Sequence, residues 1–232
     1  MRAMWDSAIL SLAAIWLALN VGAAQAQTPP TRGELAAYTG LHAAAARGTP
    51  DEVRSLAAAG GLDARDSNGR TPLHVATFQR RPEIAKLLIG AGANHALLDK
   101  QRYDAVTIAA VQDDAPTLRA LLSSGASAGL TTSIYDGTAL IAAAHLGHDE
   151  VVRELIKAGA PLDHVNNLGW TALIEAVVLG DGGRRHVATA RALVDAGARG
   201  DIGDRQGVTP LQHARARGYS EMIAVLAGRA TK

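Results

Sequence analysis

The sequence predicts an all-α solenoid of about six helix-turn-helix repeats connected by β-hairpin tips. Three observations lead to this fold class: a motif that recurs about every 33 residues, a composition rich in alanine, and a scarcity of aromatic rings. Hydrophobic residues make up 48% of the 232 residues, whereas aromatic residues make up only 3%. A core filled by Ala, Leu, Ile and Val favours closely packed helices over a sandwich or a barrel.

One short motif begins six times along the chain. Its copies begin at Thr39, Thr71, Asp104, Thr138, Thr171 and Thr209, which are 32, 33, 34, 33 and 38 residues apart. The second copy reads Thr71-Pro72-Leu73-His74-Val75-Ala76, and four of the copies continue with an aliphatic pair and then Gly-Ala. A repeat of this length is typical of solenoids, in which stacked units share one core.

These motifs resemble the ankyrin repeat over nearly the whole chain, from about residue 36 to residue 228. The T-P-L-H-x-A core of that family is complete in the second copy. The resemblance implies one ankyrin-repeat domain over residues 36–230. Its repeats would lie approximately at 36–66, 67–99, 100–132, 133–165, 166–203 and 204–230.

The predicted helices begin and end with suitable capping residues. Thr71 and Thr209 are typical N-caps, and Pro72 and Pro210 follow at the first helical position, where proline costs no hydrogen bond. Pro82 marks the start of a second helix in the same way. The glycine of each Gly-Ala pair falls where a helix C-terminus needs left-handed backbone. Helix pairs are therefore expected in each repeat.

The first 26 residues have the features of an export signal. Arg2 precedes an apolar stretch from Ile9 to Val21, and Ala24-Gln25-Ala26 presents the small residues of a signal-peptidase site. The stretch is shorter than the ~20 apolar residues that span a membrane. We therefore expect a signal peptide over 1–26, cleaved after Ala26, and a short linker over 27–35. The mature protein would be periplasmic or secreted, without stable membrane insertion; an uncleaved membrane anchor is the alternative.

The resemblance implies that a partner protein binds to the concave face, which the hairpin tips and the inner helices form. Four of the aromatic residues map to this face, and aromatic anchors often dominate protein interfaces. With one tip arginine and one inner-helix histidine they give the predicted partner-binding set. The set is Arg70, Phe78, Tyr103, Tyr135, His145 and Trp170. The alternative is that the tip rings brace the neighbouring hairpin.

The fifth copy is five residues longer than the second between its motif threonine and its glycine. We expect the extra residues to form a Gly-rich loop over 180–186. Glu175 on the preceding helix needs a partner if it is buried, and Arg184 or Arg185 is predicted to supply it. The predicted loop site comprises Glu175, Asp181, Arg184, Arg185 and His186, next to Trp170. The alternative is a tolerated insertion without a binding role.

Composition and motifs argue against other functions. Lys and Arg number 23 and Asp and Glu 22, so a net charge of +1 gives no electrostatic footprint for nucleic acid. The absence of cysteine excludes disulfides, thiolate metal sites and a cysteine nucleophile. No catalytic or nucleotide-binding motif is present. His145 and His148 have a spacing that can chelate a metal, but Gly147 interrupts the helix between them.

We therefore predict a non-enzymatic protein that acts as an interaction scaffold in an exported compartment. It would be a monomer, bind another protein by surface complementarity, and use no cofactor and no metal. The alternative function is an accessory protein that handles a small ligand or a metal at the 180–186 loop.

Overall fold

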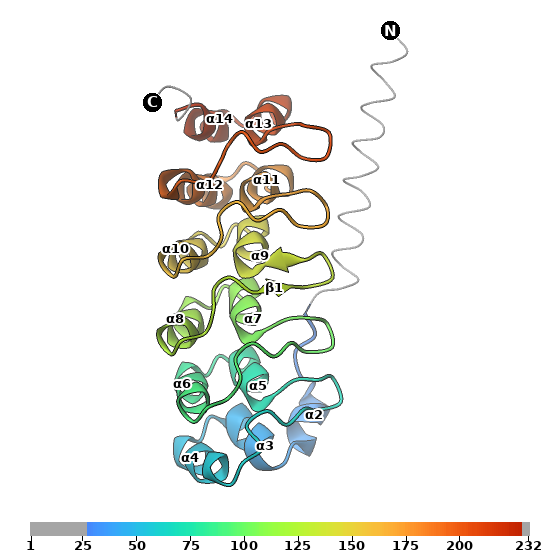
Figure 1. The fold of residues 1–232 in the computed structure, drawn as a ribbon, viewed down its shortest axis with the longest axis vertical. Coiled ribbons are helices and arrows are strands. Elements are labelled where there is room, and N and C mark those ends of the chain that lie inside the picture. The colour runs from blue at the N-terminus through green and yellow to red at the C-terminus, as the bar shows by residue number, and fades with distance from the viewer. Residues whose placement is uncertain (1–26, 229–232) are drawn as a thin grey trace.

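Six helix pairs follow one another in the described part of the chain. The computed structural model describes residues 27–228, and Figure 1 shows the pairs stacked with their tips on one side. The first helix of each pair, next to the tips, is the inner helix, and the second is the outer helix. The inner helices are α3 (Gly40–Arg47), α5 (Pro72–Phe78), α7 (Ala105–Val111), α9 (Ala139–His145), α11 (Ala172–Val178) and α13 (Pro210–Arg217). The outer helices are α4 (Pro50–Ala58), α6 (Pro82–Gly90), α8 (Ala115–Ser123), α10 (Asp149–Lys157), α12 (Arg184–Ala196) and α14 (Ser220–Ala227).

One apolar core runs through the stack. It extends from Leu41 in α3 to Leu226 in α14 and consists almost entirely of Ala, Val, Leu and Ile. Because alanine is small, neighbouring helices approach closely, and every residue of α5 and α11 is buried. Each repeat therefore completes its core against its neighbours. The predicted all-α solenoid is confirmed.

Local capping explains where the inner helices begin. The Thr71 hydroxyl accepts a hydrogen bond from the His74 amide, and the His74 ring accepts one from the Thr71 amide at 3.0 Å. In the third repeat Asp104 replaces the threonine, and its carboxylate accepts from the Thr107 amide at 2.8 Å. Because aspartate is as good an N-cap as threonine, the third repeat keeps its helix start despite departing from the motif.

Several inner helices end against a side chain of the next repeat. The last carbonyl groups of a helix have no partner within that helix. The Ala110 carbonyl of α7 lies 2.8 Å from Nδ1 of His148, and the Val178 carbonyl of α11 accepts from Arg217 at 2.9 Å. These contacts satisfy the helix ends and join successive repeats.

The tips reverse the chain in two ways. In the tips of the second, third, fifth and sixth repeats, a side-chain oxygen accepts hydrogen bonds from two backbone amides of the same tip, which is the arrangement of an Asx turn. The residues that supply it are Asp66, Asp99, Asn166 and Asp204. The fourth repeat instead pairs β1 (Thr131–Thr132) with β2 (Gly137–Thr138) as antiparallel strands. The predicted hairpin tip thus takes the form of paired strands in the fourth repeat and of turns in these four.

The chain before the first repeat folds back onto the tips. Residues 27–37, the N-terminal arm, contain α2 (Arg32–Ala37), and Thr31 and Glu34 form a capping box at its start. The segment predicted as a linker, 27–35, therefore includes the first turn of a helix. Figure 1 shows the arm running past the tips of the second and third repeats. The predicted signal peptide, 1–26, lies outside the described residues.

The extra residues of the fifth repeat lengthen an outer helix. α12 has 13 residues, whereas α10 has 9. Gly183 is the N-cap of α12, and Arg184, Arg185 and His186 form its first turn. The prediction of a loop over 180–186 was therefore wrong for its second half. A further helical turn pairs backbone groups that a longer loop would leave to solvent.

Candidate functional site

The N-terminal arm covers the tips of the second and third repeats. The Gln101 side chain bonds Thr28 twice, accepting from its amide at 2.9 Å and donating to its hydroxyl at 3.0 Å. The Arg70 guanidinium donates to the Thr28 carbonyl at 3.2 Å, and the side-chain amide of Asn68 donates to the Glu34 carboxylate at 2.6 Å. The protein's own chain therefore covers part of the tip surface of these two repeats.

Arg70, predicted to contact a partner, is buried beneath the arm. Its side chain is 0% exposed and pairs with Asp66 at 2.7 Å and with Glu34 at 2.5 Å. Tyr38 donates to the same Asp66 carboxylate at 2.6 Å, and burial raises the pKa of Tyr38. Burial acts to raise the pKa of Asp66, but hydrogen bonds from Tyr38 and Arg70 outweigh it and lower that pKa. The prediction for Arg70 was wrong because the arm shields it from any partner.

Phe78 is also inaccessible. This last residue of α5 is 6% exposed, and its carbonyl accepts from Gln112 of the next repeat at 3.3 Å. The prediction that its ring binds a partner was wrong because the stacked third repeat closes over the end of α5. Of the four aromatic residues predicted to bind a partner, the three tip residues remain.

Those three rings are half-buried in the third, fourth and fifth tips. Burial raises the pKa of Tyr103. The Tyr135 hydroxyl is buried and receives no hydrogen bond. The Trp170 amide donates to the Asn166 side chain at 3.0 Å and so closes its tip. Each of the three residues therefore keeps part of its surface accessible.

Three exposed aliphatic side chains lie in the fourth repeat. They are the large hydrophobic residues of 27–228 that reach 40% exposure: Ile134 40%, Leu146 40% and Val165 46%. The Asn167 side chain of the fifth tip donates to the Ile134 carbonyl at 2.8 Å, so Ile134 and Val165 lie on adjoining tips. Sequence reasoning missed them because it selected aromatic residues, one arginine and one histidine as anchors and no aliphatic residue. A bulky aliphatic residue beside a turn was the signal that could have found them.

His145 and Glu175, assigned to different predicted sites, meet between α9 and α11. Glu175 is 3% exposed, and its Oε1 accepts from Asn166 at 3.0 Å. Its Oε2 lies 3.3 Å from Nδ1 of His145, whose side chain is 42% exposed. The predicted pairing of Glu175 with Arg184 or Arg185 was therefore wrong.

The other residues of the predicted loop site pair elsewhere. Arg185 pairs with Asp113 of the third repeat at 2.7 Å, and His186 pairs with Asp181 at 2.9 Å. Arg184 is exposed in the first turn of α12. Arg185 thus reaches the turn between α7 and α8, and His186 also contacts the His145 carbonyl at 3.0 Å, whereas neither side chain pairs with the buried carboxylate of α11. The five predicted residues do not converge on one site.

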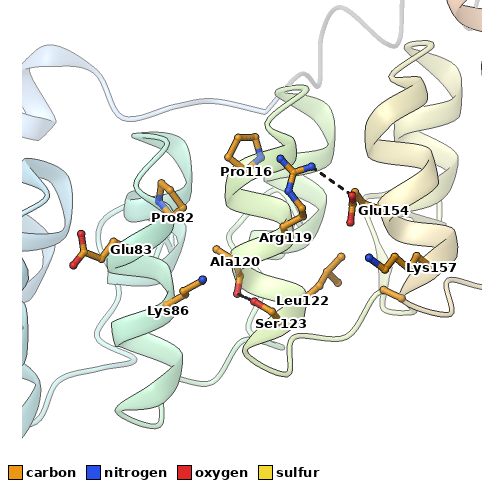
Figure 2. Close-up of a pocket in the computed structure, with 11 residues that line it drawn as sticks. Pro82, Glu83, Lys86, Pro116, Arg119, Ala120, Leu122, Ser123, Glu154 and Lys157 are labelled. Atoms are coloured by element: carbon orange, nitrogen blue, oxygen red, sulfur yellow. Dashed lines mark hydrogen bonds and ion pairs between the residues drawn. The ribbon is translucent and has the colours of Figure 1, made fainter.

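A shallow groove of about 780 Å³ lies across the outer helices α6, α8 and α10. Figure 2 shows Lys86 and Lys157 directed toward α8 from its two sides, with Leu122 between them. Arg119 pairs with Glu154 at 3.4 Å on the rim of this groove. The groove contains none of the predicted binding residues and belongs to the side of the stack remote from the tips.

Residues 27–228 offer little for chemistry. They contain no group of three or more His, Asp or Glu side chains placed to hold a metal ion. His148, considered as a metal ligand with His145, instead contacts the Ala110 carbonyl. No helix within this range has the length and apolarity that crossing a membrane requires. The candidate site offers a surface for contact with another molecule.

The repeats match a known family. A family model described as ankyrin repeats in three copies matches residues 11–99 and 106–199. The chain belongs to the ankyrin repeat family. The family indicated by the motif spacing is thus confirmed, and ankyrin repeats are non-enzymatic scaffolds that generally mediate protein–protein interactions.

Individual ankyrin repeat proteins are similar along most of the chain. The protein YahD of Escherichia coli K12 is 32% identical over 79% of this chain and 92% of its own length. The crystal structure of an ankyrin repeat domain from Acinetobacter baumannii is 42% identical, with a TM-score of 0.76 over 83% of this chain and 98% of that one. Human B-cell lymphoma 3 protein is 31% identical over 87% of this chain, which spans 52% of the human protein.

Proposed function

We propose that this protein is an exported scaffold that binds another protein through the tip face of its fourth to sixth repeats. The tip face is the accessible surface of the tips and inner helices, and its part within residues 133–228 is the open half. Binding is by surface complementarity, by a monomer, without a catalytic step or a cofactor. Tyr135, His145 and Trp170 of the predicted set lie in this half.

The observation that carries the proposal is the contrast along the tip face. The arm occupies the second and third tips, whereas the fourth repeat exposes Ile134, Leu146 and Val165. Exposed apolar surface favours binding of a partner, because removing it from water gains about 25 cal/mol per Å². Tryptophan, which supplies the half-buried ring of Trp170, is among the residue types most enriched at interface hot spots.

Export is the second part of the proposal. It rests on the signal features of residues 1–26, and cleavage after Ala26 would make Gln27 the first residue of the mature chain. Thr28, one residue later, is held by Gln101. We expect the mass of the protein isolated from the periplasm or medium to correspond to residues 27–232. A mass that includes residues 1–26 would contradict cleavage.

The binding test is partner capture by two matched double variants. Ile134→Asp with Val165→Asp places charge on the open half, and Lys86→Asp with Lys157→Asp places charge on the outer groove. We expect the first variant to lose the partner that is crosslinked to the unaltered protein in its native compartment, and the second to retain it. Circular dichroism should show both to be folded. Capture that survives in the first variant and is lost in the second would move the binding site to the outer groove.

A further inference from the structure

One buried carboxylate in the open half has an incomplete set of partners. Glu175 lies in the middle of α11, where every other residue is an apolar residue that is also buried. Its side chain is 5% exposed. An ionised carboxylate withdrawn from water is strongly unfavourable unless a cation or several hydrogen-bond donors compensate it.

The two oxygens of Glu175 differ in what they contact. Oε1 accepts from Asn166 at 3.0 Å. Oε2 is buried and receives no hydrogen bond, although His145 Nδ1 lies 3.3 Å away. Among the described residues, the ion-pair partner of Glu175 is this imidazole, which carries a positive charge only when it is protonated. Oε2 is therefore an acceptor without a committed donor.

The sixth repeat shows what a completed pair looks like at the same position. His213 occupies in α13 the place that Glu175 occupies in α11, and it pairs with the tip residue Asp204 at 2.7 Å. The fifth tip has Asn166 where the other Asx tips have aspartate, so that the tip donates to Glu175 and does not repel it. Its amide adds no positive charge, so the tip supplies Glu175 with a hydrogen bond and no cation.

The ring of His145 lies beside Oε2, with Nδ1 at 3.3 Å, and is itself partly exposed. The His145 side chain is 42% exposed and stands at the C-terminal end of α9. A change of its side-chain rotamer would give a partner access to Oε2. Leu146, the next residue, is 40% exposed and offers apolar surface for the aliphatic stem of a long side chain.

We propose that Glu175 is the receptor for a cationic side chain, an arginine or lysine of the partner protein, which takes the place of the His145 ring and donates to Oε2. Arginine fits best, because a guanidinium donates several hydrogen bonds in a fixed fork. The inference rests on the proposed function and adds to it the chemistry of one contact. His145 acts as a positioning residue that covers the carboxylate until the partner arrives.

The test uses the full chain with Trp5 and Trp16 changed to Phe, so that tryptophan emission reports Trp170 alone. This residue is bonded to Asn166, the hydrogen-bond donor of Glu175, and so reports on the same tip. N-acetylarginine amide is titrated, with N-acetylcitrulline amide as its uncharged isostere. We expect a saturable change with the arginine compound and binding of the citrulline compound that is weaker by about tenfold or more.

Three variants distinguish an effect of the Glu175 charge from an effect on folding. Glu175→Gln retains an acceptor for Asn166 and should weaken arginine binding by about tenfold or more. Asp195→Asn removes an exposed carboxylate of α12 in the same repeat and should leave binding unchanged, and His145→Ala should retain or tighten it. Equal binding of the two compounds, no saturation, or unchanged binding in Glu175→Gln would overturn the inference. If the open half still captures the partner in that case, the proposed function stands and this contact alone fails.

Discussion

The two halves of the tip face are built from the same repeat but differ in how accessible their surfaces are. Arg70 and Trp170 each stand directly before a motif threonine, and each closes its tip through its backbone amide. Arg70 is buried under the arm by carboxylate pairs, whereas Trp170 remains partly accessible in a tip that borders exposed Val165. In the covered half, residues 27–132, the arm contacts the second and third tips through hydrogen bonds and ion pairs. The difference shows that the side chains at equivalent positions, together with the arm, decide how accessible each tip is.

The largest expected effect concerns the covered half. Arg70→Met keeps the apolar stem but leaves the Asp66 and Glu34 carboxylates without their shared cation, and we expect a loss of about 3 kcal/mol or more in the free energy of unfolding. Urea unfolding measures it. Arg102→Met is the control, because Arg102 is 51% exposed and its pair with Asp136 should contribute less than about 1 kcal/mol. Equal losses in the two variants would show that the buried pairs do not hold the arm.

As the pH falls, the covered half should lose folding stability before the open half does. Burial lowers the pKa of His74 to about 4, whereas an unfolded chain keeps it near 6.5. The unfolded state then binds the proton more readily, so stability that is complete above pH 6.5 is lost as the pH falls toward 4, by up to about 3 kcal/mol. Ile141 and Ile174 occupy this position in the fourth and fifth repeats and do not titrate.

Hydrogen exchange at pH 5 and pH 7 checks this order. We expect amides of the second repeat to lose protection at pH 5 while those of the fifth keep theirs. His74→Gln should flatten the dependence of stability on pH between 6.5 and 4. Earlier loss of protection in the fifth repeat would contradict the assignment.

A smaller effect should isolate the arm. Gln101→Ala removes both side-chain bonds to Thr28 and should weaken docking of residues 27–31 by about 1 kcal/mol. Limited proteolysis should then cleave the arm faster, with little change in global unfolding. Gln206→Ala, at the equivalent position of the sixth tip, should leave the arm as resistant as before.

The smallest effect on stability is expected in the open half. Ile134→Ser with Val165→Ser should change the free energy of unfolding by less than about 0.5 kcal/mol, because both side chains are already exposed. Thermal unfolding of this double variant measures the change. A loss of several kcal/mol would mean that the two residues support the stack, and the contrast between the halves would disappear.

The sequence predicted the features that depend on neighbouring residues. Thr71-Pro72 fixed a helix start, and the motif spacing fixed the order of helix pairs. It failed where a contact joins distant segments. Arg70 is buried by Thr28 and Glu34, which are 42 and 36 residues away in the chain. No local pattern indicates such a contact.

The candidate site shows the same limit. Trp170 and His145 were placed on the tip face from their positions in the motif. The ion-pair partner of Glu175 was assigned to the nearby arginines, but the imidazole that pairs with it comes from the previous repeat. Local positions in a repeat can be predicted, whereas the pairs formed between repeats depend on how far each helix extends.

Site-specific photo-crosslinking in the native compartment tests the central claim most directly. A photoreactive phenylalanine derivative would replace Ile134 or Val165 in the open half, and Asn68 or Gln101 in the covered half. We predict that the first two positions crosslink one and the same partner protein and that the second two do not. Crosslinks to the partner from positions 68 and 101, with none from 134 and 165, would contradict the account.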